Sequence, residues 1–170
     1  MRANKQMTPL LFALAVVLAD QLTKWWVMES FMPHESKVII AGFFDLTFIT
    51  NTGAAFGLFA GEQTMGRQIF FVAVGVVALI ALALIFRQQK NQSCFFSWAI
   101  GLVAGGALGN MIDRLRFGSV VDFLDFYVSN YHWPAFNVAD SAITVGVGFF
   151  LLDAFLTRNH GKTRNKEEIV

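Results

Sequence analysis

The sequence predicts an integral membrane protein, mainly α-helical, with four transmembrane helices and a small extramembrane element. Of its 170 residues, 55% are hydrophobic and only 15% are charged, whereas charged residues make up about a quarter of a typical soluble domain. The chain also holds several long apolar stretches of the length that crosses a bilayer. A net charge of +1 shows no basic excess for binding nucleic acid, and a single cysteine excludes an internal disulfide. We expect one domain over residues 1–170.

The first apolar stretch begins at Pro9, after a basic N-terminus, and it has two interpretations. It resembles a cleaved signal peptide, which has a basic start, a short apolar core and a cleavage site at small residues. The possible cleavage site here is residues 17–19. The alternative is an uncleaved first span over residues 9–28. In that span Asp20 and Lys24 lie one helical turn apart, near its outer end. The residue pattern alone leaves both interpretations open.

Residues 29–66 are too polar and too interrupted to cross a bilayer. Within them, residues 44–48 alternate with a period of two, which predicts a half-buried strand. The sequence Asn51–Gly53 breaks this pattern, and residues 54–60 are predicted to form a short helix at the membrane interface. We expect a small extramembrane element here, not a separate domain.

Two further apolar stretches predict the second and third spans. Residues 68–86 contain no charged residue, and at about 1.5 Å per residue they are long enough for the apolar core of a bilayer. Residues 93–112 follow after a short polar turn. Glycines at three- and four-residue spacing let helices approach closely in lipid, so close packing is the role we expect for them. The third span holds Gly101, Gly105, Gly106 and Gly109.

The distribution of basic residues predicts the topology. Residues 114–134 form a second extramembrane segment, and residues 135–156 form the fourth span, which a basic tail follows. The N-terminus, the turn after the second span and the tail hold eight of the thirteen Lys and Arg residues. With four spans these three segments lie on one side, which the positive-inside rule assigns to the cytoplasm. We therefore expect both termini in the cytoplasm, and residues 29–66 and 114–134 on the outer side.

This topology places almost all the buried-looking polar residues at one depth, near the outer surface. Helical spacing puts Asn110 and Arg114 on one face of the third span, and Asn137 and Asp140 on one face of the fourth. A carboxylate at the centre of a membrane helix costs about 2.5–3.5 kcal/mol, so acids in apolar surroundings indicate function. The residues that converge are Asp20, Asn51, Asn110, Arg114, Asp122, Asn137 and Asp140.

The pair Asp122 and Asp140 points to aspartic-peptidase chemistry. Two carboxylates held close together share one proton, so one can take a proton from water while the other donates one to the scissile carbonyl. No histidine or cysteine lies among the converging residues, and Ser119 and Ser141 have no visible base, which argues against a serine or cysteine nucleophile.

Other roles for the acids stay open at this point. A hard-cation site is chemically allowed, although no ligand-spacing motif supports it. Asp113 and Arg114 are expected to pair or to cap a helix, Asp125 to be a solvated loop acid, and Asp153 to anchor the inner interface. For the central pair, the spacing alone does not separate catalysis from a structural role. The cation site would be built from Asp20, Asp113, Asp122 and Asp140.

Five motifs resemble those of the bacterial lipoprotein signal peptidases (signal peptidase II). They span nearly the whole chain in the order of that family, and none departs from its pattern. The motifs are DQLTK at 20–24, NTGAAFG at 51–57, GGALGNMIDR at 105–114, GSVVDFLDF at 118–126 and FNVADSAI at 136–143.

The resemblance implies an aspartic endopeptidase of the bacterial inner membrane. Its fold has four spans, a small periplasmic β-cradle and a short interfacial helix, which favours the uncleaved first span. Its substrates are prolipoproteins whose lipobox cysteine carries diacylglycerol, and it cuts on the N-terminal side of that cysteine. It uses no metal or other cofactor, and cyclic-peptide antibiotics such as globomycin occupy its site.

The resemblance also implies roles for the converging residues. Asp122 and Asp140 match the catalytic dyad. The residues that match positions supporting the dyad or holding substrate are Asp20, Asn51, Asn110, Arg114 and Asn137. We further expect Asn51–Gly61 to move as a lid, and the protein to act as a monomer among membrane lipids without nucleic acid.

Two other functions make different predictions from this one. In a small ion-coupled transporter the same acids would line a path, but a path predicts acids at several depths and inverted repeats. The acids here lie at one depth and no repeat is evident. A structural or chaperone-like membrane protein would tolerate Asp→Asn changes at both acids.

Overall fold

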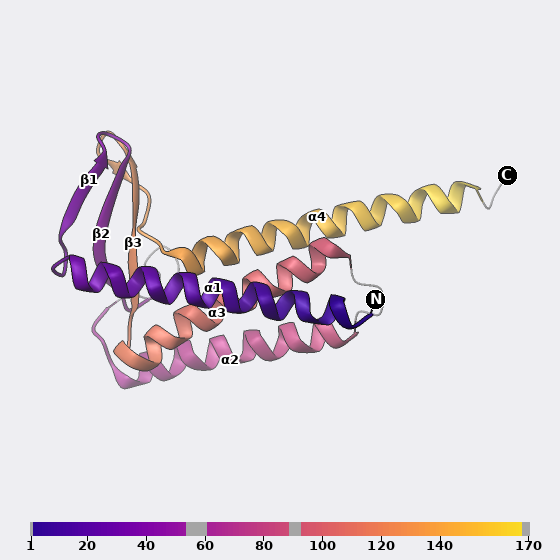
Figure 1. Ribbon diagram of the computed structural model, residues 1–170, viewed down its shortest axis with the longest axis horizontal. Coiled ribbons are helices and arrows are strands. Elements are labelled where there is room, and N and C mark those ends of the chain that lie inside the picture. Colours follow the sequence, from indigo (N-terminus) through magenta and orange to yellow (C-terminus); the bar gives the residue numbers. More distant parts are fainter. Residues whose placement is uncertain (1, 54–60, 89–92, 168–170) are drawn as a thin grey trace.

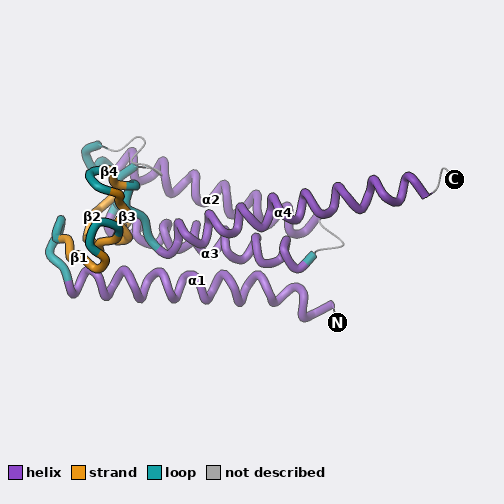
Figure 2. Tube along the Cα trace, turned by 90° about the horizontal axis from the view of Figure 1, so that it is seen from above, coloured by secondary structure: helices purple, strands orange, loops and turns teal. Residues whose placement is uncertain are grey.

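The computed structural model describes residues 2–53, 61–88 and 93–167. In this part of the chain four helices form a bundle, and a small antiparallel sheet lies across one end of it (Figure 1, Figure 2). The helices are α1 (Arg2–Ser30), α2 (Met65–Gln88), α3 (Cys94–Phe117) and α4 (Val138–Glu167). The strands are β1 (Ser36–Ile40), β2 (Phe44–Asn51), β3 (Val120–Val128) and β4 (Tyr131–His132).

All four of these helices are long and apolar enough to cross a membrane, which confirms the predicted fold class. The third span extends beyond residue 112 because α3 continues to Phe117, where Gly118 ends it in the left-handed conformation (φ 73°) that glycine adopts without strain. The fourth span begins after residue 135 because Asn137 caps α4. The spanning stretches are Met7–Ser30, Met65–Gln88, Cys94–Phe117 and Val138–Thr157.

The first helix is continuous through residues 17–19, where the sequence also allowed a cleavage site. Its N-terminal half packs closely on α3. A Cβ atom added at Gly101 would lie 2.7 Å from the carbonyl oxygen of Pro9, and one added at Gly105 would lie 2.8 Å from that of Ala13. This packing favours the interpretation as an uncleaved span.

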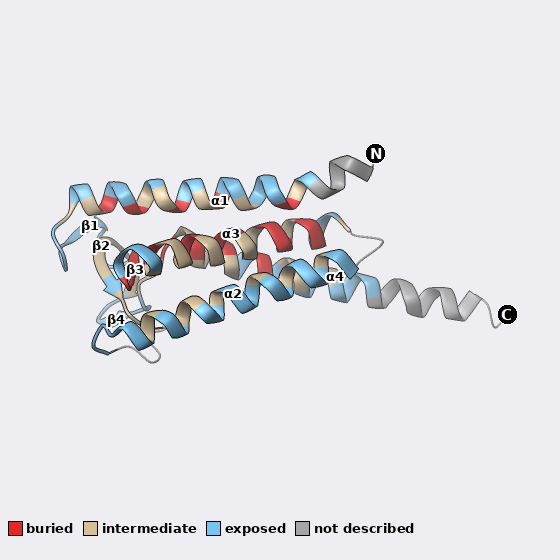
Figure 3. Ribbon diagram, turned by 90° about the horizontal axis from the view of Figure 1, so that it is seen from below, coloured by how far each residue is buried: buried red, intermediate tan, exposed pale blue. Residues whose placement is uncertain are grey.

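The central helix of the bundle is α3. Buried residues are concentrated along it, whereas none of the described residues of α2 is buried (Figure 3). Close approach to α4 depends on Gly106, where an added Cβ atom would clash with the carbonyl oxygen of Ala139. The prediction that these glycines allow close helix packing is therefore confirmed.

The sheet has the strand order β1-β2-β3-β4, with neighbouring strands antiparallel. In the β2–β3 pair, Ile49 lies opposite Asp122 and Asn51 lies opposite Val120, so Asn51 and Asp122 come close together. The sheet packs on the C-terminal end of α1 through a small apolar core. The buried members of this core are Val27, Val121 and Phe123.

The predicted strand at residues 44–48 is confirmed as the first part of β2. The small β-sheet that the family resemblance implied is also present, but the positions of β1, β3 and β4 in the sequence were not predicted. The segment around Asp122 and Asp125, expected to be a loop, forms β3. Its first four residues are all buried, so apolar residues occupy both faces and the period-two pattern is lost. The interfacial helix predicted at residues 54–60 lies outside the described residues.

We expect Gly106→Ala to destabilise the protein, because the new methyl group would meet a backbone oxygen that cannot move without separating α3 from α4. Thermal unfolding in detergent should show a clearly lower midpoint temperature. The matched control is Gly148→Ala on α4, where an added Cβ atom meets nothing within 4 Å, and its midpoint should not fall. Equal midpoints for Gly106→Ala and the natural protein would contradict this packing argument.

Candidate active site

A cavity of about 670 Å³ lies where the C-terminal end of α3 and the N-terminal end of α4 meet the sheet. Five of the seven predicted site residues line it, and the other two, Asp20 and Asn137, are fully buried. The fold therefore brings all the predicted residues into one region, and they come from α1, α3, α4, β2, β3 and the residue before α4. The five that line the cavity are Asn51, Asn110, Arg114, Asp122 and Asp140.

Asp122 reaches the cavity from β3 and is only 3% exposed. Its Oδ2 atom accepts a hydrogen bond from the Asn51 amide at 3.1 Å, and its Oδ1 atom accepts one from the Asn137 amide at 2.7 Å. Burial, and next the nearby charge of Asp140, raise the pKa of Asp122 from 3.8 to about 7, although both amides act in the opposite direction. This carboxyl group can therefore hold or release a proton near neutral pH.

Asp140 lies in the first turn of α4, where it takes part in a reciprocal cap. The side-chain oxygen of Asn137 accepts the backbone N–H of Asp140 at 3.0 Å, and Oδ2 of Asp140 accepts the backbone N–H of Asn137 at 3.3 Å. This is the arrangement of a capping box, with Asp at the position where Glu is usual. The Oδ1 atom of Asp140 accepts a hydrogen bond from the Asn110 amide at 2.8 Å.

Behind the cavity lies an ion cluster formed by Asp20, Lys24 and Asp113. The Lys24 ammonium lies 2.9 Å from Oδ2 of Asp20 and 2.8 Å from Oδ2 of Asp113, and all three side chains are at most 1% exposed. The second oxygen of Asp20 accepts the backbone N–H of Ala139 at 2.9 Å. The cluster therefore connects α1 and α3 to the first turn of α4.

The expected pairing of Asp113 with Arg114 is wrong, because adjacent residues on a helix point about 100° apart. Asp113 faces Lys24 and also accepts the backbone N–H of Val121 at 3.1 Å. Arg114 turns the other way, donating to the carbonyl oxygen of Gly53 at 2.6 Å and lying 4.4 Å from the ring centre of Phe71.

Sequence reasoning did not assign Lys24 or Asp113 to the site. The available signal was the i, i+4 spacing of Asp20 and Lys24 inside an otherwise apolar helix, because a charge there needs a partner. Gln21 was also missed, and its amide donates to Oδ1 of Asp113 at 2.9 Å.

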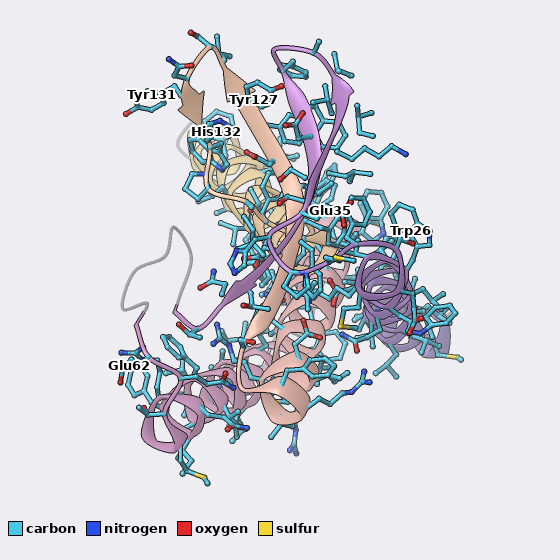
Figure 4. The ribbon with its side chains drawn as sticks, turned by 90° about the vertical axis from the view of Figure 1, so that its left-hand side faces the viewer. Trp26, Glu35, Glu62, Tyr127, Tyr131 and His132 are labelled. Atoms are coloured by element: carbon cyan, nitrogen blue, oxygen red, sulfur yellow. The ribbon has the colours of Figure 1, made fainter. Side chains whose placement is uncertain are left out.

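Asp125 is not a solvated loop acid, because it lies in β3 and its carboxylate is 2.9 Å from the Nδ1 atom of His132. Tyr127 stacks on the same histidine, and both lie toward one end of β3 (Figure 4). Asp153 accepts a hydrogen bond from the hydroxyl group of Ser93, the residue that caps α3. It therefore joins the N-terminal end of α3 to the C-terminal half of α4.

The four acids considered for a cation site do not come together in the described part of the chain. They separate into two pairs: one pair binds Lys24, and the other lies at the cavity. Among the described residues there is no group of three or more His, Cys, Asp and Glu side chains with the geometry to hold a metal ion.

Comparison with known proteins shows the family of the chain. The family model described as signal peptidase (SPase) II matches residues 12–156. The lipoprotein signal peptidase of Syntrophotalea carbinolica is 50% identical over 143 residues, which cover 84% of this chain and 88% of the relative. That of Syntrophus aciditrophicus is 45% identical over 138 residues, which cover 81% and 86%. A bacterial membrane enzyme solved by the in meso method at 2.3 Å resolution superposes with a TM-score of 0.79, at 36% identity and 91% coverage of both chains.

The fold and these matches together define a multi-pass membrane hydrolase of the aspartic peptidase class. The chain belongs to the signal peptidase II family, whose curated members are lipoprotein signal peptidases. The resemblance inferred from the five motifs is therefore confirmed. None of the relatives described above supports the transporter alternative.

Asp122 should make the stability of the protein depend on pH. A carboxyl group whose pKa is higher in the folded state stabilises the fold below its unfolded pKa of about 4. This contribution is lost as the pH rises through the folded value of about 7. The midpoint of thermal unfolding should therefore fall between pH 4 and pH 8, and it should fall less in Asp122→Asn. Parallel curves for the two proteins would contradict the raised pKa.

Proposed function

We propose that this protein removes the signal peptides of diacylglyceryl-modified prolipoproteins, with Asp122 and Asp140 as its catalytic dyad. In this proposal it cuts on the N-terminal side of the lipidated cysteine. Membership of the family supports the substrate class. The assignment of the dyad follows from the five motifs and from the site geometry.

The observation that carries the assignment is the pair of carboxylates at one cavity. Asp122 and Asp140 both line it, and the charge of Asp140 is one of the causes that raise the pKa of Asp122 to about 7. Both carboxylates accept amide hydrogen bonds that hold them in place. Such a pair can share one proton near neutral pH, which is the state that aspartic-peptidase chemistry requires.

The reaction then proceeds with one acid protonated and one ionised. Asp140, at the positive N-terminal end of α4, takes a proton from a water molecule, whose oxygen attacks the scissile carbonyl carbon. Protonated Asp122 donates its proton to the carbonyl oxygen. In the tetrahedral intermediate the proton on Asp140 passes to the amide nitrogen, and the C–N bond breaks as the C=O bond forms again. The carboxyl product leaves, and Asp122 takes back the hydroxyl proton.

The surroundings of the dyad suit a lipid-modified substrate. The acyl chains of a diacylglyceryl cysteine stay in the leaflet, which holds its scissile bond at the depth of the outer membrane surface. Water can still reach this depth. The apolar part of the cavity wall can receive the substrate, and its members include Val120, Phe136, Ile143 and Val145.

Arg114 has the donors needed to bind the substrate backbone. Its Nη2 atom donates to Gly53, whereas its buried Nη1 atom has no hydrogen-bond partner among the described residues. Since Arg114 lines the cavity, we assign Nη1 to a carbonyl oxygen of the bound peptide. A planar guanidinium can make both contacts at once.

We also propose that the protein lies in the inner membrane, with both termini in the cytoplasm and the site on the periplasmic side. The positive-inside pattern of Lys and Arg residues supports this orientation. In a Cys94→Ser background, a membrane-impermeant thiol reagent should label Asn130→Cys in spheroplasts and label Gln88→Cys only after the membrane is opened. The reverse result would overturn the orientation.

Three expectations about partners and motion belong to the same proposal. Globomycin-type cyclic peptides should bind this cavity, and one 170-residue chain among membrane lipids should suffice for activity. A lid at Asn51–Gly61 stays a prediction, because residues 54–60 lie outside the described residues. The described ends of that segment are joined by a hydrogen bond of 2.8 Å from the Thr52 hydroxyl group to the Gly61 carbonyl.

Purified protein should cleave a diacylglyceryl-modified prolipoprotein, and Asp122→Asn or Asp140→Asn should lower kcat by about a thousandfold or more, because each removes a proton-transfer group. A chelator should not change the rate. The matched control is Asp125→Asn on the same strand as Asp122, and it should keep most of the activity. Unchanged cleavage by both dyad variants would refute the dyad, and loss of activity on chelation would point to a metal.

Arg114→Lys should lose most activity while the amount of folded protein in the membrane stays the same. Lysine keeps the positive charge but cannot donate to Gly53, lie flat over Phe71 and reach the substrate together. The measurement is the initial cleavage rate at equal protein concentration. A rate close to that of the natural protein would count against the backbone contact.

A further inference from the structure

The side chain of Lys24 makes a contact that the ion cluster does not explain. Besides Asp20 and Asp113, its ammonium donates to the Oδ1 atom of Asn110 at 2.9 Å. A lysine ammonium has three N–H groups and no acceptor. All three are therefore used, and one of them points at an amide that contacts Asp140.

This contact decides which way the Asn110 amide is turned. Because Lys24 can only donate, the side of the amide that faces it must be the oxygen. The NH₂ group of Asn110 must then face the opposite way, where it donates to Oδ1 of Asp140 at 2.8 Å. The Asn137 amide makes a second, longer contact of 3.3 Å to the same Asn110 oxygen.

The orientation matters because Asp140 changes its protonation state during the proposed reaction. An ionised carboxylate would attract the NH₂ group of Asn110 without help from Lys24. Once Asp140 has taken a proton from water, a free amide could turn its oxygen toward the new O–H group and stabilise the protonated acid. An amide fixed by Lys24 cannot do this, so Asp140 faces an N–H donor in both states and passes its proton on more readily.

We propose that Lys24 is a positioning residue for the dyad: its buried ammonium fixes the Asn110 amide so that NH₂ faces Asp140 throughout the reaction. The inference rests on the proposed function of Asp140. It gives Lys24 a role besides neutralising Asp20 and Asp113, a role that affects the rate of the chemical step and not the binding of substrate.

The test is a double-mutant cycle on prolipoprotein cleavage, with Lys24→Met, Asn110→Ala and the double variant. Losing a hydrogen bond to a charged group should lower kcat about 10- to 100-fold in each single variant. KM should change by no more than about twofold, because uniform substrate binding is kept. If Lys24 acts through Asn110, the double variant should be about as slow as Asn110→Ala alone.

A purely structural role for Lys24 predicts a different result. In that case Lys24→Met would lower the midpoint of thermal unfolding. The double variant would then have its kcat reduced by the product of the two single-variant reductions. Two results would overturn the positioning role. One is a double-variant kcat reduced by the product of the two single-variant reductions, and the other is an unchanged kcat in folded Lys24→Met. The control is Thr23→Val, since among the described residues the Thr23 hydroxyl group bonds to carbonyl oxygens of its own helix, at 2.7 and 2.9 Å. Its kcat should not change.

Lys24→Met leaves two buried carboxylates without their cation and is at risk of not folding. The same cycle is therefore also run in an Asp113→Asn background, where removal of the lysine leaves one such carboxylate. The natural protein is measured in every assay. If the natural protein does not cleave the substrate, both the proposed function and the role of Lys24 are refuted. If it cleaves the substrate but the kcat reductions of the two single variants multiply in the double variant, only the role of Lys24 is refuted.

Discussion

The structure depends on one constraint, which is that a charge inside a membrane protein must find partners within the protein. Lys24 is buried in the bundle, so its ammonium group needs three acceptors at hydrogen-bond distance. Two carboxylates and one amide supply them, from α1 and α3. Asp20 also accepts a backbone N–H of the first turn of α4. The hydrogen bonds around this one ammonium group therefore fix α1, α3 and α4 relative to each other.

The two carboxylates at the cavity also find their partners within the protein, but these partners are asparagine amides and not charged groups. Each asparagine around the carboxylates is oriented by a group on its other side that can only donate. Asn137 accepts the backbone N–H of Asp140, and Asn51 accepts that of Gly53 at 2.9 Å. All three amides therefore present N–H groups to the acids. The two carboxylates are held by different elements, one a strand and the other the start of a helix.

Hydropathy and charge were sufficient to predict the four spans, because both follow directly from transfer of side chains into lipid. The common depth of the polar residues followed from topology in the same way. The strand β3 was not predictable, since its first residues are buried on both faces and show no alternation. The partner of Asp113 was missed because its neighbour in sequence, Arg114, points elsewhere, and the true partner lies in another helix. The orientation of Asn110 required the packed structure, because no sequence pattern records which atom of an amide faces which neighbour.

Because of the reciprocal cap at the start of α4, selection for folding acts differently on Asp140 and Asp122. Asp140 satisfies a backbone group of its own helix, so a protein selected only for folding would still gain from an acid there. Asp122 lies in a buried strand where its charge is disfavoured, so selection for folding alone would replace it. A lineage that no longer uses the reaction is therefore expected to change position 122 before position 140, and sequences of relatives without activity would reveal that order.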